Sequence, residues 1–143
     1  MSIDQRSQTA ANELNWMLVN FVRATDGVRD AVAVSSDGLL IAQSHGLDRA
    51  GADHLSAIVS SLASVARSAS RKYEFDGLKL IMVEMRAGFL LVSATSGGSC
   101  IGVLAEGGCD VGLVGYEIAV LADRFGAQLT PALITECRSH LPR

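Results

Sequence analysis

Apolar residues recur along the chain with two different spacings, which together predict three long helices and five strands. From Leu14 onward, within residues 11–25, they fall at every third or fourth position, the spacing of one face of a helix. The same spacing returns in residues 50–71 and after Asp110. The remaining apolar segments are short and rich in β-branched residues, which is typical of strands.

The five predicted strands form one pair and one group of three, each joined by short turns. Asp37-Gly38 between two apolar segments predicts a hairpin with a tight primed turn, whose centre needs positive φ. The strands are expected at residues 28–35, 39–44, 78–85, 89–96 and 99–106. Because hairpins make neighbouring strands antiparallel, the predicted fold class is α+β: a single five-stranded, mostly antiparallel sheet sandwiched between helices, in the order α-β-β-α-β-β-β-α plus a short C-terminal helix.

A chain of 143 residues suits one domain, because domains commonly run to about 100–200 residues. We expect a flexible N-terminus over residues 1–10, the folded domain over 11–129 and a short helical extension over 130–143. Thr130-Pro131 begins that extension with a capping residue and a residue suited to the first helical position.

Charge and apolar content exclude several classes of protein. The net charge is −3 and the basic residues are scattered, whereas nucleic-acid binders carry a basic stripe. The N-terminus has no apolar segment of the kind that marks a secretory signal. The uncharged run 87–105 is broken at its centre by turn-forming residues. We therefore expect a cytoplasmic protein without membrane insertion and without nucleic acid as a partner.

No residue pattern indicates a metal or a cofactor. Cys100, Cys109 and Cys137 form no CxxC pair, and the three histidines show no ligand spacing with them. The glycines of residues 107–117 match neither dinucleotide-binding nor P-loop spacing, and no lysine is available to reach a phosphate. We predict no metal and no cofactor.

One segment, residues 32–48, contains side chains of the types found in catalytic triads: Ser36, Asp37 and His45. A nucleophile needs its base within hydrogen-bond reach, but His45 follows a strand that leads away from the turn. No GxSxG elbow occurs in the chain. We interpret the segment as the bend of a hairpin and predict no catalytic residue.

The second helix has an unusual composition, since residues 55–66 carry no charge over three turns. A surface helix of a monomer normally opposes an apolar stripe with a charged face. Here the opposite face consists of small residues: Ser56, Ala57, Ser60, Ala63 and Ser64.

Strand 78–85 is mostly apolar on both faces, and an edge strand of that kind needs a partner for its backbone groups. We expect the second helix and this strand to form a homodimer. The expected interface residues are Leu55, Ile58, Val59, Leu62, Val65, Leu78, Leu80 and Met82.

The order of these segments resembles the Roadblock/dynein light chain family from about Leu14 to Leu133. The segments that carry the resemblance are GVRDAVAVSSDGLLIAQS, the uncharged second helix, the three following strands and DVGLVGYEIAVLADRFGAQLTPAL. The similarity is closest to actinobacterial members encoded beside a sensor kinase and a small Ras-like GTPase. It implies a five-stranded sheet between helices and a homodimer through the second helix and third strand.

The resemblance also implies a function, because family members bind small GTPases or act as platforms in larger complexes, and some assist GTP hydrolysis by their partner. For this chain it implies a non-catalytic homodimer that regulates or scaffolds a small Ras-like GTPase, with a sensor-kinase complex as a further partner. The expected GTPase-contact face comprises Asp53, His54, Ser60, Ser64 and Arg67. Nothing in the sequence selects an arginine finger among Arg49, Arg67 and Arg71. The alternative is an α+β domain that senses a small molecule and has no GTPase partner.

Overall fold

Five strands form a single sheet in the order β2-β1-β5-β4-β3. In the computed structural model, which describes residues 3–129, every pair of neighbouring strands is antiparallel. The strands are β1 (Val28–Val34), β2 (Leu40–Gln43), β3 (Leu80–Met85), β4 (Gly88–Ala94) and β5 (Cys100–Glu106). The predicted α+β fold with one antiparallel sheet is confirmed, and β2 and β3 are the two edges of that sheet.

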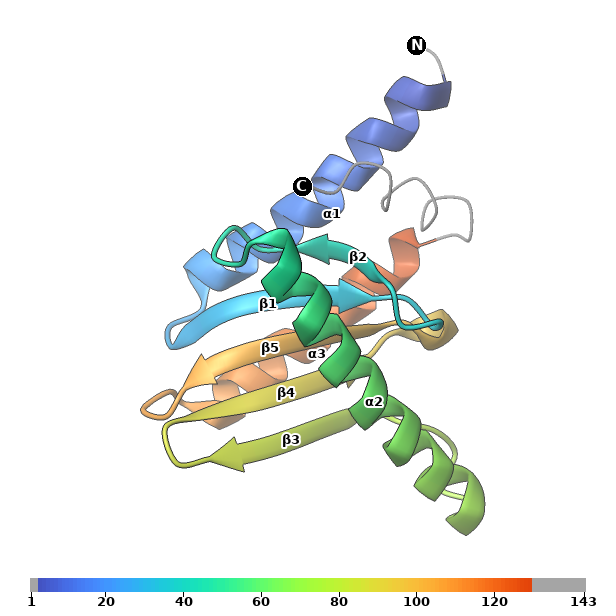
Figure 1. Ribbon diagram of the computed structural model, residues 1–143, viewed down its shortest axis with the longest axis vertical. Helices are drawn as coiled ribbons and strands as arrows, with labels where there is room; N and C mark the ends of the chain where they lie inside the picture. The colour runs from blue at the N-terminus through green and yellow to red at the C-terminus, as the bar shows by residue number, and fades with distance from the viewer. Residues whose placement is uncertain (1–2, 130–143) are drawn as a thin grey trace.

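Three helices cover the sheet on both faces. Helix α2 (Arg49–Tyr73) crosses one face, and α1 (Ile3–Ala24) and α3 (Val111–Gln128) lie on the other (Figure 1). A short 3-10 turn, η1 (Ser96–Gly98), joins β4 to β5. The C-terminal turns of α2 continue past the β3 edge of the sheet (Figure 1), so no part of this sheet lies beneath them.

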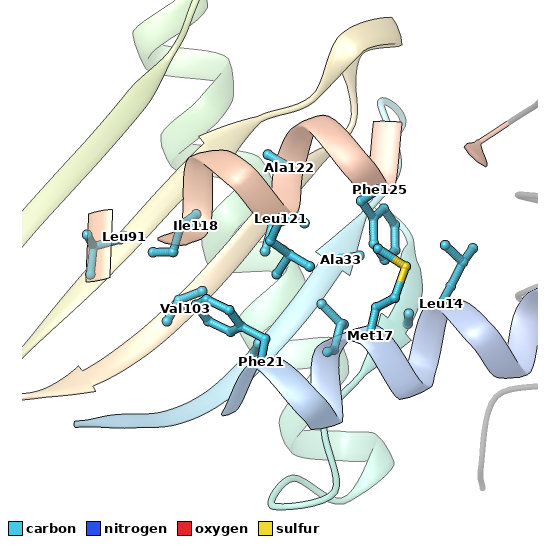
Figure 2. Close-up of a cluster of buried hydrophobic side chains, with 14 of the residues drawn as sticks. Leu14, Met17, Phe21, Ala33, Leu91, Val103, Ile118, Leu121, Ala122 and Phe125 are labelled. Carbon is cyan, nitrogen blue, oxygen red and sulfur yellow. The ribbon is translucent and has the colours of Figure 1, made fainter. Parts of the chain in front are cut away.

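The larger core lies between the sheet and the helices α1 and α3 (Figure 2). Met17 and Phe21 of α1 point toward Leu121 and Phe125 of α3, and all four side chains are buried. Every second residue of the strands completes the cluster on the sheet side, because successive side chains of a strand point to opposite faces. These strand residues include Ala31, Ala33, Leu91, Ile101 and Val103.

The second core lies between α2 and the opposite face of the sheet. Leu55, Val59 and Ala63 of α2 are buried there. The strand side chains that point to this face pack against the helix. They are Val32, Val34, Leu40, Leu90, Val92 and Cys100. Each side of the sheet therefore has its own apolar cluster, which accounts for the near-continuous apolar texture of β1, β4 and β5.

Helix α1 begins at Ile3, inside the segment 1–10 that the sequence analysis assigned to a flexible N-terminus. The helix predicted within residues 11–25 therefore begins earlier than expected. Residues 3–10 contain few apolar residues to reveal a period, but they contain no glycine or proline to stop a helix. The predicted helix after Thr130 lies outside the described residues.

The β1–β2 turn also differs from the prediction. The amide N–H of Ser35 donates to the Leu39 carbonyl at 2.8 Å, and that of Gly38 donates to the Ser35 carbonyl at 2.9 Å. The loop is three residues long, and within it only Gly38 has positive φ, at 85°. The predicted hairpin is present, but the expected primed turn is wrong, because a three-residue loop closes the hairpin with a left-handed glycine at its end.

Candidate functional site: the outer face of α2 and the β3 edge

Local hydrogen bonds fix both ends of α2. The Asp48 carboxylate accepts from the Gly51 amide at 2.7 Å, which satisfies one of the free amides of the first turn. The helix ends at Tyr73, and the next residue, Glu74, caps it in a left-handed conformation (φ 58°) while its amide N–H donates to the Ser70 carbonyl. The rotation of α2 against the sheet then decides which side chains face outward.

The inner side of α2 includes two of the residues expected at a dimer interface. Leu55 is 6% exposed and Val59 is fully buried, and both pack against the chain's own sheet. Leu62 and Leu78 are half-buried against the same cluster. Leu55 and Val59 therefore stabilise the single chain and offer no surface to a partner.

The other four expected interface residues are exposed. The exposed fractions are 40% for Ile58, 71% for Val65, 44% for Leu80 and 46% for Met82. Ile58, Leu62 and Val65 lie four and three residues apart, so they form one stripe along the helix. We call this stripe the apolar flank of α2.

The β3 edge has backbone groups without a strand partner. The Lys79 carbonyl accepts from the Ala94 amide at 3.0 Å, and the ladder to β4 continues in register, with Met82 opposite Leu91. Bonded and non-bonded pairs alternate in an antiparallel ladder, so the backbone groups of Leu80, Met82 and Glu84 point away from β4. The expected edge strand is confirmed for the sheet described here.

The residues expected to contact a GTPase do not form one continuous group. Asp53, Ser60, Ser64 and Arg67 are separated by whole turns of α2 and share one side, which we call the polar flank. His54 is exposed but lies four residues before Ile58, on the apolar flank. Asp53 is also engaged within its helix, because its carboxylate pairs with Arg49 Nε at 3.1 Å.

A small polar cavity of about 260 Å³ separates the polar flank from the β1–β2 turn. Ser60, Ser64 and Arg67 line one side, and Ser36 and Asp37 line the other. The proximity of the polar flank to the β1–β2 turn could not be predicted from the sequence, because only the tertiary fold brings the two segments together.

Arg67 is the most strongly held residue of the polar flank. Its guanidinium donates to the Gly98 carbonyl at 2.8 Å and to Cys100 Sγ at 3.4 Å. Burial raises the pKa of the Cys100 thiol, and the nearby Arg67 charge and hydrogen bond oppose that rise. Arg67 thus ties α2 to the β4–β5 connection, and in this conformation it is not a freely projecting arginine.

The structure does not bring the three triad-like side chains together. The Ser35 hydroxyl lies within hydrogen-bond distance of the Asp37 carboxylate and the Leu39 carbonyl, either of which can accept its one proton, so these groups shape the turn. His45 follows the other end of β2 and lines a different cavity. Among residues 3–129, no three histidine, cysteine or acidic side chains form a group that could hold a metal.

That second cavity, of about 560 Å³, lies between α1 and the connection from β2 to α2. Trp16, Gln43 and Arg49 are among its lining residues. Sequence reasoning missed this site, because these residues are far apart in the chain and belong to no motif. Only the indole of Trp16, which is 59% exposed, departs from the expected pattern, because large aromatic side chains are usually well buried.

Comparison with known proteins adds the family. The family model described as the Roadblock/LC7 domain matches residues 14–105. A Roadblock/LC7 domain from Streptomyces avermitilis is 35% identical with a TM-score of 0.71, over 76% of this chain and 90% of that chain. A further Roadblock/LC7 domain from Streptomyces avermitilis is 30% identical with a TM-score of 0.65, over 78% of this chain and 97% of that one.

The fold is shared more widely than the sequence. MglB from Myxococcus xanthus has a TM-score of 0.73 at 12% identity, over 80% of this chain and 93% of that chain. Among curated proteins, none has a sequence that matches this one significantly. Within the part of the chain that the structure describes, no helix is both long and apolar enough to cross a membrane.

Proposed function

The chain belongs to the Roadblock/LC7 domain family, whose members are protein-interaction modules, and on this premise we propose that it is a non-catalytic homodimer that binds a small Ras-like GTPase and regulates or scaffolds it. The observation that carries the proposal is the exposed apolar flank of α2 together with the unpaired β3 edge. Neither surface suits a monomer in water, because exposed edges and apolar patches promote association.

The geometry of α2 supports pairing between two copies. A two-fold axis perpendicular to the sheet would place two β3 strands antiparallel and keep both α2 helices on the same face. The backbone groups of Leu80, Met82 and Glu84 would then bond to the partner's edge. The turns of α2 that continue past β3 (Figure 1) would lie over the partner's sheet. An interface of this kind uses the same patch on both subunits, as two-fold dimers do.

The polar flank is the surface that we propose for the GTPase. Ser64 is exposed, and Ser60 is half-buried beside the β1–β2 turn, where a Cβ on Gly38 would stand 2.7 Å from its Oγ. A partner on this flank would therefore contact α2 together with that turn. Asp53 and Arg67 lie at the two ends of the polar flank, and His54 lies on the neighbouring apolar flank. Arg49 is paired with Asp53 and Arg67 with the Gly98 carbonyl, so we assign no arginine finger.

Affinity capture tests the GTPase proposal. The tagged protein is mixed with lysate of the source cell containing either a non-hydrolysable GTP analogue or GDP, and bound proteins are identified by mass spectrometry. We expect a Ras-like GTPase that is enriched in one nucleotide state. Ser60→Arg places a large cation on the polar flank and should lower this capture at least about tenfold, which corresponds to about 1.4 kcal/mol, while the dimer stays intact.

Ala119→Arg is the matched control, because it adds the same side chain to the exposed side of α3. This variant should capture the GTPase as the wild type does. Absence of any GTPase in both nucleotide states would contradict the proposed function. Unchanged capture by Ser60→Arg would remove the polar flank from the proposal.

The second candidate function is small-molecule sensing without a GTPase partner, and the cavity of about 560 Å³ between α1 and the start of α2 favours it. Its size falls within the range of about 300–1,000 Å³ that is usual for small-molecule pockets. A small molecule that co-purifies with the protein, combined with failure to capture a GTPase, would select this function.

A further inference from the structure

The cavity between α1 and the β2–α2 connection has the mixed lining of a ligand site. Val19 and Leu47 supply apolar surface, and Trp16, the single tryptophan of the chain, lies at the same cavity. Asn15 and Gln43 supply amides. Pockets that bind small molecules combine a largely apolar lining with a few fixed polar groups that orient the ligand.

Gln43 is the fixed polar group. Only 4% of the Gln43 surface is exposed to solvent. Its backbone amide donates to Asn15 Oδ1 at 3.1 Å, and its side-chain Nε2 donates to the Leu47 carbonyl at 2.7 Å. The second bond holds the side-chain amide against the β2–α2 connection and identifies its nitrogen, so the remaining atom, Oε1, can only accept.

Gln43 Oε1 is buried and accepts no hydrogen bond from any described residue. A buried acceptor without a donor is unfavourable and uncommon in folded proteins. Every other buried side-chain nitrogen or oxygen among the described residues has a partner. The exception belongs to a residue that lines the largest of the cavities discussed here, and it therefore marks a place where a donor from outside the described residues would bind.

The charges at the cavity indicate that the missing donor is neutral. Arg49 is already paired with Asp53 at 3.1 Å. The Asp48 carboxylate accepts from the Gly51 amide at the start of α2. Asp48 and Arg49 carry opposite charges, so together they give the lining no net charge that would select a charged ligand.

We propose that this cavity binds a small, neutral molecule with a planar ring and an N–H or O–H donor. The donor bonds to Gln43 Oε1, and the ring packs against the Trp16 indole and the aliphatic side chains of Val19 and Leu47. A planar ring suits this lining because aromatic pairs gain from offset or edge-to-face packing. The site lies on α1 and β2, away from the β3 edge, so it does not depend on the proposed dimer or on a GTPase.

Two related amides test the proposal on the wild-type protein. Benzamide has a planar ring and an N–H donor, whereas N,N-dimethylbenzamide has the ring and carbonyl but no donor. Titration to millimolar concentration is followed by the fluorescence of Trp16 and by backbone amide shifts in an NMR spectrum. We expect benzamide to change the Trp16 signal and to shift resonances of Gln43, Ser44 and Leu47, with an affinity about tenfold above that of the dimethyl compound.

A variant pair tests the role of Gln43. Gln43→Met keeps the approximate length of the side chain and removes Oε1, so benzamide should bind it no better than the dimethyl compound binds the wild type. Ser60→Ala, which alters the other cavity, should bind benzamide normally. Equal binding of the two amides by the wild type would overturn the proposal without reliance on any variant. Absence of a response of Trp16 and its neighbours to either amide would overturn it as well, and would assign the partner of Gln43 Oε1 to water.

Discussion

Gly102 of β5 lies beneath Val59 of α2, so close that a Cβ on Gly102 would stand 2.4 Å from Val59 Cγ2. No side chain therefore separates the helix from the middle of the sheet at this point. This approach seats α2 with Leu55, Val59 and Ala63 inward. Its apolar flank is left outward as a consequence, and the proposed interface depends on that rotation.

The first prediction concerns this contact. Gly102→Ala should lower the free energy of unfolding by about 1–3 kcal/mol, the usual cost of forcing an extra carbon into a packed core. Urea denaturation at a fixed protein concentration measures the change. Gly115→Ala is the control, because a Cβ there would meet nothing within 4 Å, and in the interior of α3 alanine should stabilise the protein by up to about 1 kcal/mol. Equal stability of the two variants would refute the close approach of α2.

The second prediction concerns Asp30, whose side chain is buried and accepts a hydrogen bond from Ser44 Oγ at 3.5 Å. Burial raises the pKa of the Asp30 carboxyl, against the opposing effects of the Arg29 charge and the Ser44 hydrogen bond. The folded protein therefore binds a proton more tightly than the unfolded chain, whose carboxyl has a pKa of about 3.8. Stability from this group is complete below that value and is lost as pH rises through the raised folded pKa.

Asp30→Asn removes this titration. The melting temperature of the variant minus that of the wild type should increase as pH rises from about 3.8 through the raised pKa of Asp30, and then stay constant. Thermal melts followed by circular dichroism across this range measure the difference. Parallel profiles for the two proteins would show that Asp30 has the same pKa in the folded and unfolded states.

The third prediction separates structure from binding on the polar flank. Arg67→Met should lower the free energy of unfolding by about 1 kcal/mol, because it removes the charged donor to the Gly98 carbonyl, which is only partly shielded from water. Arg71→Met should change it by less than about 0.5 kcal/mol, since exposed Arg71 contacts only the hydroxyl of Ser68 on its own helix among the contacts described. Chemical denaturation of both variants gives the comparison. A larger decrease in the free energy of unfolding for Arg71→Met than for Arg67→Met would contradict the assigned roles.

The periodic segments and the positions of their turns were predictable because local patterns determine them. The Asp110 cap of α3 is an example, since aspartate is a common first cap of a helix and the Asp110 carboxylate accepts from the Leu113 amide at 3.2 Å. The edge position of β3 did not follow from the sequence, because a strand that is apolar on both faces is also typical of the interior of a sheet. The start of α1 was not predictable from periodicity, because its first turns contain too few apolar residues to show a period.

The orientation of α2 was only partly predictable. The uncharged composition of residues 55–66 indicated that two sides of the helix meet other groups, but it could not say which side faces the sheet. Gly102 decides this, and it lies more than thirty-five residues further along the chain. The cavity at Gln43 was likewise beyond sequence reasoning, because its walls come from α1 and from the β2–α2 connection.

The central claim is that two copies of this chain pair through the β3 edge and the apolar flank of α2. Met82→Pro removes the outward-pointing amide of Met82 and leaves the ladder to β4 intact, since proline is tolerated on the open side of an edge strand. Met82→Val keeps the amide and is the matched control. The measurement is the molar mass by light scattering at micromolar concentration, with folding verified by circular dichroism. We predict twice the 15.0 kDa chain mass for the wild type and Met82→Val, and a folded monomer for Met82→Pro. A monomeric wild type, or a Met82→Pro protein as dimeric as the wild type, would contradict the account.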